Sequence, residues 1–170
     1  DELFHLRDFP HMSAGLKVGR FMLIGEIGAG KTTLFNHLFG RNEAARKTQV
    51  LEFEGDSGID TPGEYFSHPR LYHALITMAA DVERLVYVHP ADVFDCRLPY
   101  GLLDVYADKT IDAIVTKMDL PGADLARVTA LLRQAGIAGQ IFAVSGTDLA
   151  SMEKVRQHLL AAEPCLTEET

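Results

Sequence analysis

Residues 25–32 read GEIGAGKT, which matches the pattern GxxxxGK[ST] of phosphate-binding loops. The apolar run before it, residues 20–24, predicts a buried strand, and residues 32–39 predict a helix that ends at Gly40. In this order of strand, loop and helix, the glycines let backbone N–H groups turn toward phosphate oxygens, and the helix N-terminus adds favourable partial charge. The stretch therefore predicts an α/β fold built around a phosphate site.

The side chains of this loop have separate expected roles. Lys31 reaches the β- and γ-phosphates of a nucleotide, and Thr32 offers its hydroxyl to Mg²⁺. A glycine-rich turn without a ligand is the alternative. A dinucleotide-binding fingerprint is excluded, because GEIGAG has the order GxxGxG and not GxGxxG. The nucleotide contacts predicted here are Gly25, Glu26, Ile27, Gly28, Ala29, Gly30, Lys31, Thr32 and Thr33.

Short apolar runs alternate with helical patterns along the rest of the chain. This is typical of a three-layer α/β/α fold, in which helices cover both faces of a mainly parallel sheet. Apolar Leu51 and Phe53 alternate with glutamates, so residues 50–54 are expected to form an antiparallel edge strand with one wet face. Residues 57–59 have the pattern of a poor strand. The other expected strands are 84–89, 111–116 and 140–144, and the other expected helices are 70–80, 101–106, 124–135 and 148–162.

The length and composition indicate one globular domain. The chain has 170 residues, of which 47% are hydrophobic and 24% are charged, so it can bury an ordinary core. Asp and Glu outnumber Lys and Arg by 24 to 16, and the formal charge of -8 disfavours a nucleic-acid partner. No apolar stretch approaches the roughly 18 residues of a membrane helix, so no membrane partner is expected. Cys96 and Cys165 lack disulfide or metal-ligand spacing, which favours a reducing cytoplasm.

Both ends of the chain are expected to lie outside the domain. His11 and Met12 resemble a cloning junction, so residues 1–12 are expected to be a tag or leader. The alternative is an apolar segment that docks on this protein or on a partner. A proline ends the last helix, and residues 164–170 are expected to form an acidic tail. The domain itself is expected to span residues 13–163.

A second motif, DTPG, begins at Asp60. A carboxylate at a strand end can hold Mg²⁺ through water, and the N–H of Gly63 can contact a γ-phosphate. An ordinary β-turn is the alternative, but the phosphate loop upstream favours the functional interpretation. Asp60 is therefore predicted to hold the metal, and Gly63 is predicted to act at the transferred phosphate.

A third motif, TKMD, ends the apolar strand at 111–116, and a Ser-Gly pair ends the next strand. Asp119 can accept hydrogen bonds from the N1–H and the exocyclic amine of guanine, the Lys117 stem can cover the base, and the Gly146 N–H can meet O6. Adenine lacks these donors, and it would leave the carboxylate unpaired at a cost of about 1–3 kcal/mol. The predicted base-site residues are Thr116, Lys117, Asp119, Ser145 and Gly146.

In this order the motifs resemble those of the translation-factor-like small GTPases, which have a Ras-like P-loop NTPase fold, over residues 20–161. More narrowly, the chain resembles the EutP/PduV family, which accompanies bacterial microcompartments for ethanolamine and propanediol utilization. The resemblance implies GTP and GDP as ligands, Mg²⁺ as cofactor, and a cytoplasmic protein associated with a microcompartment. It implies a shell or cargo protein, an activator or a second copy of the chain as partners. The segments that resemble the family are GKTTL at 30–34, KTQ at 47–49, IDTPGEY at 59–65, YHAL at 72–75 and VTKMDL at 115–120.

The resemblance also implies roles for three further side chains. It makes Thr48 the switch threonine that closes over Mg²⁺ and the γ-phosphate, with a solvated loop residue as the alternative. Glu64 stands where many relatives carry a Gln that orients the attacking water, so slow unaided hydrolysis is expected. Thr116 replaces the commoner Asn, which is expected to loosen the link to the phosphate loop. Residues 41–49 are short for a switch segment, so a small rearrangement is expected. The expected catalytic residues are Lys31, Thr48, Gly63 and Glu64, and the expected metal residues are Thr32, Thr48 and Asp60.

Three functions are consistent with these residues. The first is Mg²⁺-dependent GTP binding with slow hydrolysis, because positioning and charge neutralisation suffice for phosphoryl transfer to water. The second, implied by the resemblance, is an acetate kinase activity, although the sequence shows no dedicated pair of arginines for a carboxylate acceptor. The third is a module that uses nucleotide to dock on a shell or cargo protein.

Overall fold

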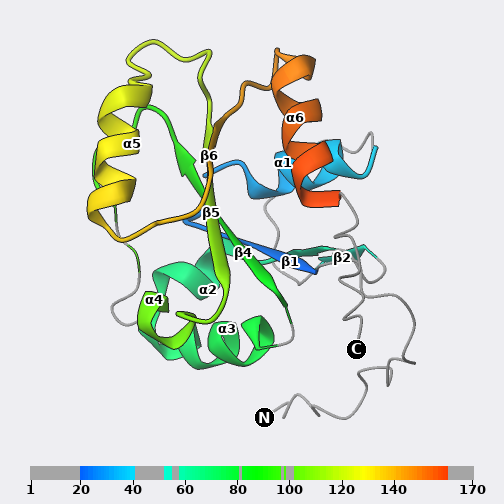
Figure 1. Cartoon of the computed structure of the whole chain (residues 1–170), viewed down its shortest axis with the longest axis vertical. Helices are drawn as coiled ribbons and strands as arrows, with labels where there is room; N and C mark the ends of the chain where they lie inside the picture. Colours follow the sequence, from blue (N-terminus) through cyan, green and yellow to red (C-terminus); the bar gives the residue numbers. More distant parts are fainter. Residues whose placement is uncertain are drawn as a thin grey trace, which may run out of the picture.

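A six-stranded sheet forms the centre of the molecule (Figure 1). The computed structural model describes residues 20–40, 52–54, 58–80, 82–96, 98 and 102–160. Thr48, the whole of the expected leader and the whole of the expected tail lie outside these described residues. The strand order is β2-β3-β1-β4-β5-β6, and β1, β3, β4, β5 and β6 run parallel to one another. The strands are β1 (Phe21–Ile24), β2 (Glu52–Glu54), β3 (Gly58–Asp60), β4 (Arg84–Pro90), β5 (Thr110–Thr116) and β6 (Ile141–Ala143).

The helices cover both faces of the sheet, as the alternating pattern predicts (Figure 1). Helices α1 and α6 pack on one face, while α2, α3, α4 and α5 pack on the other. Among the described residues, no helix is both long and apolar enough to cross a membrane. The helices are α1 (Lys31–Leu38), α2 (Gly63–Ser67), α3 (Tyr72–Ala79), α4 (Leu102–Val105), α5 (Leu125–Gln134) and α6 (Leu149–Leu160), and a 3₁₀ turn (Pro69–Leu71) precedes α3.

Strand β1 shows why the central strands are apolar throughout. Phe21 and Leu23 belong to the core beneath α1 and α6, while Met22 and Ile24 belong to the core on the opposite face. All four side chains are buried, because successive residues of a strand point to opposite faces and both faces are covered. The phosphate loop therefore begins from a strand that is held on both sides.

The edge of the sheet confirms one expectation and corrects another. Strand β2 lies at the edge and pairs antiparallel with β3, as predicted for residues 50–54. Residues 57–59 were expected to form a poor strand, and this is wrong for Gly58 and Ile59, which belong to β3. A Cβ atom at Gly58 would lie 2.9 Å from the Phe39 ring and 3.0 Å from the Phe21 ring. Packing against these rings, together with pairing to β1, outweighs the weak intrinsic strand preference of glycine.

Candidate functional site

The predicted site motifs meet at one edge of the sheet. The phosphate loop (residues 25–30) follows β1, Asp60 ends β3, Thr116 ends β5, and Ser145 follows β6. These strands are parallel, so their carboxyl ends lie at the same edge, where ligands bind in open α/β sheets. The structure therefore brings together the three motifs that the sequence analysis separated.

The phosphate loop has the backbone conformation that its glycines permit. Gly30 precedes α1 with a φ of 98°, in the left-handed region. Gly25 lies against β4, since a Cβ atom there would be 2.5 Å from the carbonyl oxygen of Val88. A side chain at either position would strain or displace the loop. The expected turn between β1 and α1 is thus formed and contains Gly28 and Ala29, while Thr33 lies in the first turn of α1.

Lys31, the first residue of α1, directly follows the loop and is only 5% exposed. Its Nζ donates to the carbonyl oxygens of Gly25, at 2.9 Å, and Glu26, at 2.8 Å. Burial lowers the pKa of Lys31 from 10.5 to about 8, although the carboxylates of Asp60 and Glu26 act in the opposite direction. The loop therefore holds a desolvated ammonium group beside its own backbone, a strong donor for a phosphate oxygen.

Thr32 and Asp60 form a hydrogen-bonded pair next to this lysine. The Thr32 hydroxyl donates to Oδ2 of Asp60 at 2.8 Å, and Asp60 is 0% exposed. A hydroxyl and a carboxylate are oxygen ligands that suit Mg²⁺, so these residues fit the predicted metal. Within the described part of the chain, no cluster of three or more His, Cys, Asp or Glu side chains could hold a metal by itself. Mg²⁺ at this pair would therefore also need oxygen atoms from water or a phosphate.

The DTPG segment packs directly on the phosphate loop. The Thr61 hydroxyl donates to the carbonyl oxygen of Leu23 in β1 at 2.6 Å. A Cβ atom at Gly63 would lie 2.6 Å from the backbone N and Cα of Ile27. Glu64 follows as the second residue of α2 and is partly buried. The two loops are thus in close contact at Gly63, beside the predicted position of a transferred phosphate.

The TKMD segment is also bonded to the phosphate loop. The hydroxyl of Thr116, which is 5% exposed, donates to the carbonyl oxygen of Ala29 at 2.6 Å. The hydroxyl of Thr116 thus reaches the phosphate loop directly, and whether this link is looser than the one an Asn would make stays a prediction. Lys117 follows with a φ of 60°, and no other described residue apart from glycines has a positive φ. This turn places Asp119 two residues further on, beside Ser145.

Asp119 is hydrogen-bonded to Ser145, the first residue of the Ser-Gly pair. The Ser145 hydroxyl donates to Oδ1 of Asp119 at 2.9 Å and also lies 2.8 Å from the Thr147 hydroxyl. Asp119 and Gly146 are exposed, so their polar atoms are open to a ligand. The serine therefore orients the carboxylate from the neighbouring strand end.

The structure adds a pocket that the sequence analysis did not predict. It has a volume of about 200 Å³ and lies between the phosphate loop, the end of β4 and the residues that follow β4. Tyr87 and His89 contribute to its walls together with Val93 and Asp95. In the sequence, Tyr87 and His89 belong to an apolar strand pattern, and nothing there indicates that they border a cavity.

The sheet order, the two helical layers and the phosphate loop define the P-loop GTPase fold. The bacterial selenocysteine-specific elongation factor EF-Sec matches with a TM-score of 0.54 and 20% identity over 88% of this chain. Methanosarcina barkeri Roco2, in a RocCORdC structure bound to GDP, matches with a TM-score of 0.57 and 19% identity over 90% of this chain. The chain spans 30% and 51%, respectively, of the lengths of those two proteins.

Within this fold class, the chain belongs to the PduV-EutP family, described as ethanolamine utilisation and propanediol utilisation, whose model matches residues 18–161. A protein of Salmonella typhimurium named "Probable acetate kinase EutP" is 50% identical over 142 residues, covering 84% of this chain and 89% of that protein. The Escherichia coli K12 protein of the same name is 47% identical over 140 residues, covering 82% and 88%. The "Propanediol utilization protein PduV" of Citrobacter freundii is 32% identical over 150 residues, covering 87% and 98%. The predicted family and fold class are therefore confirmed.

Proposed function

We propose that this chain binds GTP with Mg²⁺ and hydrolyses the GTP slowly, as part of ethanolamine or propanediol utilisation. The observation that supports this most directly is the buried Lys31 ammonium beside the Thr32–Asp60 pair, inside the phosphate loop. A buried cation next to oxygen ligands for a divalent metal suits a polyphosphate. Membership of the PduV-EutP family supports a role in ethanolamine or propanediol utilisation. We propose that the protein is cytoplasmic and associated with a bacterial microcompartment.

The phosphate loop would bind the phosphates as follows. Lys31 already donates to two loop carbonyl groups, so its ammonium can turn to the β- and γ-phosphate oxygens without leaving the loop. Thr32 and Asp60 would hold Mg²⁺, which supplies charge neutralisation on the same phosphates when it is bound. Thr48 completes this set in the proposal. The chain's own groups thereby position the phosphates and stabilise the charge that develops on them.

Guanine selectivity is proposed to come from Asp119. Ser145 bonds one of its carboxylate oxygens, which fixes the orientation of the group for the N1–H and amine of guanine. The backbone N–H of Gly146 would meet O6, and the Lys117 stem would cover the base. Adenine offers no hydrogen-bond donors to this carboxylate, so we expect the binding free energy of ATP to be about 1–3 kcal/mol less favourable than that of GTP.

Slow hydrolysis is proposed to come from Glu64. Glu64 directly follows Gly63, which is proposed to contact the γ-phosphate. The negative charge of its carboxylate would therefore repel the γ-phosphate, whereas a neutral Gln side chain would orient the attacking water. We expect Glu64→Gln to hydrolyse GTP about tenfold faster in single-turnover assays, because the amide removes this repulsion. A Glu64→Gln protein that hydrolyses no faster than the parent would contradict this explanation.

A second candidate is phosphoryl transfer to acetate, and the names of the Salmonella and Escherichia relatives favour it. In this reaction an acetate oxygen attacks the γ-phosphorus, the bond to the β-phosphate oxygen breaks, and acetyl phosphate and a nucleoside diphosphate are released. Direct measurement of acetyl phosphate, made with wild-type protein and with Lys31→Ala as the blank, tests this candidate.

The proposed function is tested by nucleotide binding. Fluorescent GTP and ATP analogues are titrated with Mg²⁺ against the wild-type chain and Asp119→Ala, after carried-over nucleotide has been removed. Asp108→Ala is the matched control, because Asp108 is exposed and lies before the amino end of β5. We expect a preference for GTP that Asp119→Ala loses and Asp108→Ala keeps. If ATP binds as well as GTP, the guanine assignment is wrong and the phosphotransferase becomes the leading candidate.

A further inference from the structure

The loop between β5 and α5 (residues 117–123), here called the base loop, contains the side chains proposed to recognise guanine. Its first residue, Lys117, has a φ of 60°, in the left-handed region that residues with a side chain rarely adopt. Such a conformation costs free energy and persists only where surrounding contacts impose it. On the β6 side, the N–H of Met118 donates to the carbonyl oxygen of Val144 at 3.3 Å. The other neighbour of β5 is β4, so the remaining support comes from the end of that strand.

On the β4 side, a single residue bonds to both ends of the base loop. The N–H of Ala91 donates at 2.8 Å to the carbonyl oxygen of Thr116, the residue just before the loop. The carbonyl oxygen of Ala91 accepts at 3.0 Å from the N–H of Asp124, the residue just after the loop. Ala91 is 0% exposed, so water does not compete for these bonds. The position of Ala91 therefore sets where the base loop begins and ends.

Ala91 belongs to a turn at the end of β4 (residues 90–93), here called the β4 turn. Within it, the N–H of Val93 donates to the carbonyl oxygen of Pro90 at 3.3 Å. Nε2 of His89, the residue just before the turn, lies 2.8 Å from the carbonyl oxygen of Val93. A carbonyl oxygen can only accept, so Nε2 holds the ring proton and donates it. The His89 ring therefore bonds across the whole β4 turn.

Tyr87 fixes the ring of His89 in turn. The Tyr87 hydroxyl lies 3.1 Å from Nδ1 of His89. Because Nε2 holds the proton of the neutral ring, Nδ1 accepts from this hydroxyl. Tyr87 and His89 are 1% and 3% exposed, and their ring centroids lie 5.6 Å apart. Two buried polar side chains that the proposed function does not use thus form a fixed support for the β4 turn.

We propose that His89 is a positioning residue for guanine recognition, a role that rests on the proposed function. Its ring holds the β4 turn, Ala91 in that turn bonds both ends of the base loop, and the base loop carries Asp119. Without the bond from His89 to Val93, the β4 turn shifts and Asp119 no longer meets both donors of guanine. Adenine offers no donor to Asp119, so the loss is specific to guanine nucleotides.

The experiment begins with His89→Phe, which keeps an aromatic ring and removes both ring nitrogens. Fluorescent GTP and ATP analogues are titrated with Mg²⁺ against the full chain. We expect GTP affinity to fall about tenfold and ATP affinity to change by less than about twofold, near the low end for one hydrogen bond to a charged group because the β6 side still holds the base loop. His89→Gln, whose amide can donate to the carbonyl oxygen of Val93, is expected to retain most of the GTP preference.

His158→Phe is the matched control. The His158 ring is also hydrogen-bonded, with Nε2 2.8 Å from Oδ2 of Asp112, but Asp112 lies near the start of β5, at the opposite end of the sheet. This variant is expected to lose stability in urea and to keep the GTP preference. Tyr87→Phe removes only the hydroxyl bonded to His89, and we expect GTP affinity to fall about threefold. It keeps the proposal testable if His89→Phe does not fold.

Amide hydrogen exchange in nucleotide-free protein separates this inference from the proposed function. Amides of residues 118–124 are expected to exchange faster in His89→Phe than in the wild type, and at the wild-type rate in His158→Phe. Unchanged exchange, or an equal loss of GTP and ATP affinity in His89→Phe, would overturn the proposal. If the wild type prefers GTP, an equal preference in His89→Phe would also overturn it. Faster exchange in a protein whose wild type shows no preference for GTP would support the positioning of the base loop and refute the proposed function.

Discussion

Two buried carboxylates lie at opposite ends of the sheet and have different surroundings. Asp60 ends β3 beside the phosphate loop, and Asp112 lies near the start of β5. They are 0% and 1% exposed, respectively. The Thr32 hydroxyl and the buried Lys31 lie next to Asp60, and both are groups that a phosphate or a metal ion could recruit.

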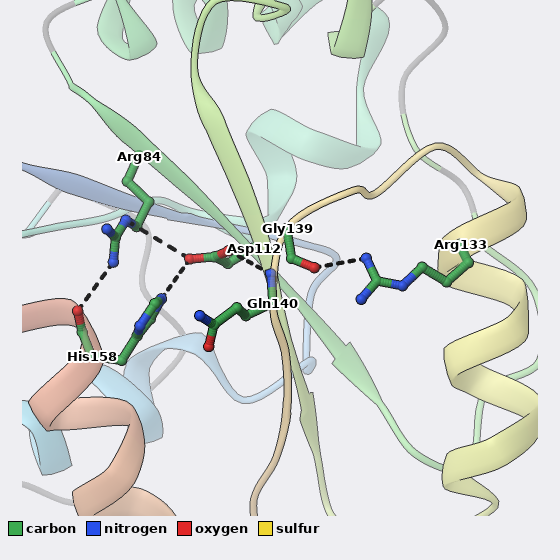
Figure 2. Close-up of polar contacts among 6 residues, drawn as sticks. All are labelled: Arg84, Asp112, Arg133, Gly139, Gln140 and His158. Atoms are coloured by element: carbon green, nitrogen blue, oxygen red, sulfur yellow. Dashed lines mark hydrogen bonds and ion pairs between the residues drawn. The ribbon is translucent and has the colours of Figure 1, made fainter.

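Asp112 is surrounded by partners from three elements (Figure 2). Its Oδ1 accepts from the backbone N–H of Gln140 at 2.8 Å, and its Oδ2 lies 2.8 Å from Nε2 of His158 on α6. Arg84, the first residue of β4, lies 3.8 Å from the same oxygen and donates to the carbonyl oxygen of His158 at 3.1 Å. These contacts join β4, the segment before β6 and the end of α6.

The difference between the two ends shows how one fold uses buried charge in two ways. At Asp112, the partners come from distant parts of the chain and fix the packing of α6 on the sheet. Next to Asp60, Lys31 and Thr32 are consecutive residues at the start of α1, and these are the groups that we expect a ligand to recruit. We therefore expect substitutions at the two ends to separate stability from binding.

The largest expected effect is on stability, at Asp112. Asp112→Ala leaves Arg84 and His158 beside an apolar gap, and we expect the free energy of unfolding to fall by about 3 kcal/mol, at the low end for broken buried pairs because both partners are partly exposed. Urea denaturation measures this, with Asp108→Ala as the control at an exposed position of the same end. A loss below about 1 kcal/mol would show that the cluster does not hold α6.

The next effect is on binding, at Lys31. Lys31→Ala removes the ammonium that we propose contacts the phosphates, so we expect GTP affinity to fall at least about a hundredfold, or roughly 2.7 kcal/mol. Stability should change little or rise, because a desolvated charge is removed from the interior. Titration with a fluorescent GTP analogue, alongside urea denaturation, measures both. A loss of stability as large as that of Asp112→Ala would remove the contrast between the two ends.

A smaller effect is expected from pH. The pKa of Lys31 in the folded, ligand-free chain is about 8, below the 10.5 of the unfolded chain. The ammonium is therefore lost above pH 8, and GTP affinity should fall by up to about tenfold per pH unit there. Between about pH 8 and 10.5 the unfolded chain binds the additional proton, so the stability of the ligand-free protein should rise with pH. Lys31→Met should show neither trend, and an affinity that is constant from pH 7 to 9.5 would contradict the assignment.

The smallest effect is expected at Thr116. Thr116→Val removes the hydroxyl that donates to Ala29 and keeps the shape of the side chain, so GTP affinity should fall by about fivefold, or roughly 1 kcal/mol. Thr116→Ser keeps the hydroxyl and should bind like the wild type. Equal behaviour of the valine and serine variants would show that this bond does not hold the loop in place.

Local patterns predicted much of this architecture. Strand β1, the glycine order of the phosphate loop and helix α1 depend on neighbouring residues, and they appear where the sequence placed them. Helix α5 begins after Asp124, whose side chain accepts from the N–H of Arg127 as a capping residue should. These features can be predicted because their causes lie within a few residues.

The features that the sequence did not predict depend on contacts between distant residues. Gly58 joins β3 because of two aromatic rings, and α2 begins at Gly63 although no helical pattern marks it. The bond between Thr116 and Ala29, like the pocket beside the phosphate loop, requires strand ends that only the assembled sheet brings together. Single-residue patterns carry no information about such distances.

The contact between Gly63 and Ile27 also restricts how this protein can diverge in sequence. Two of the atoms that a Cβ at position 63 would meet belong to the main chain of Ile27, and a single one, Cγ1, belongs to its side chain. A smaller residue at position 27 would remove Cγ1 and leave the backbone atoms in place. Position 27 can therefore accept side chains of different size. No substitution at position 27 creates room for a residue larger than glycine at position 63.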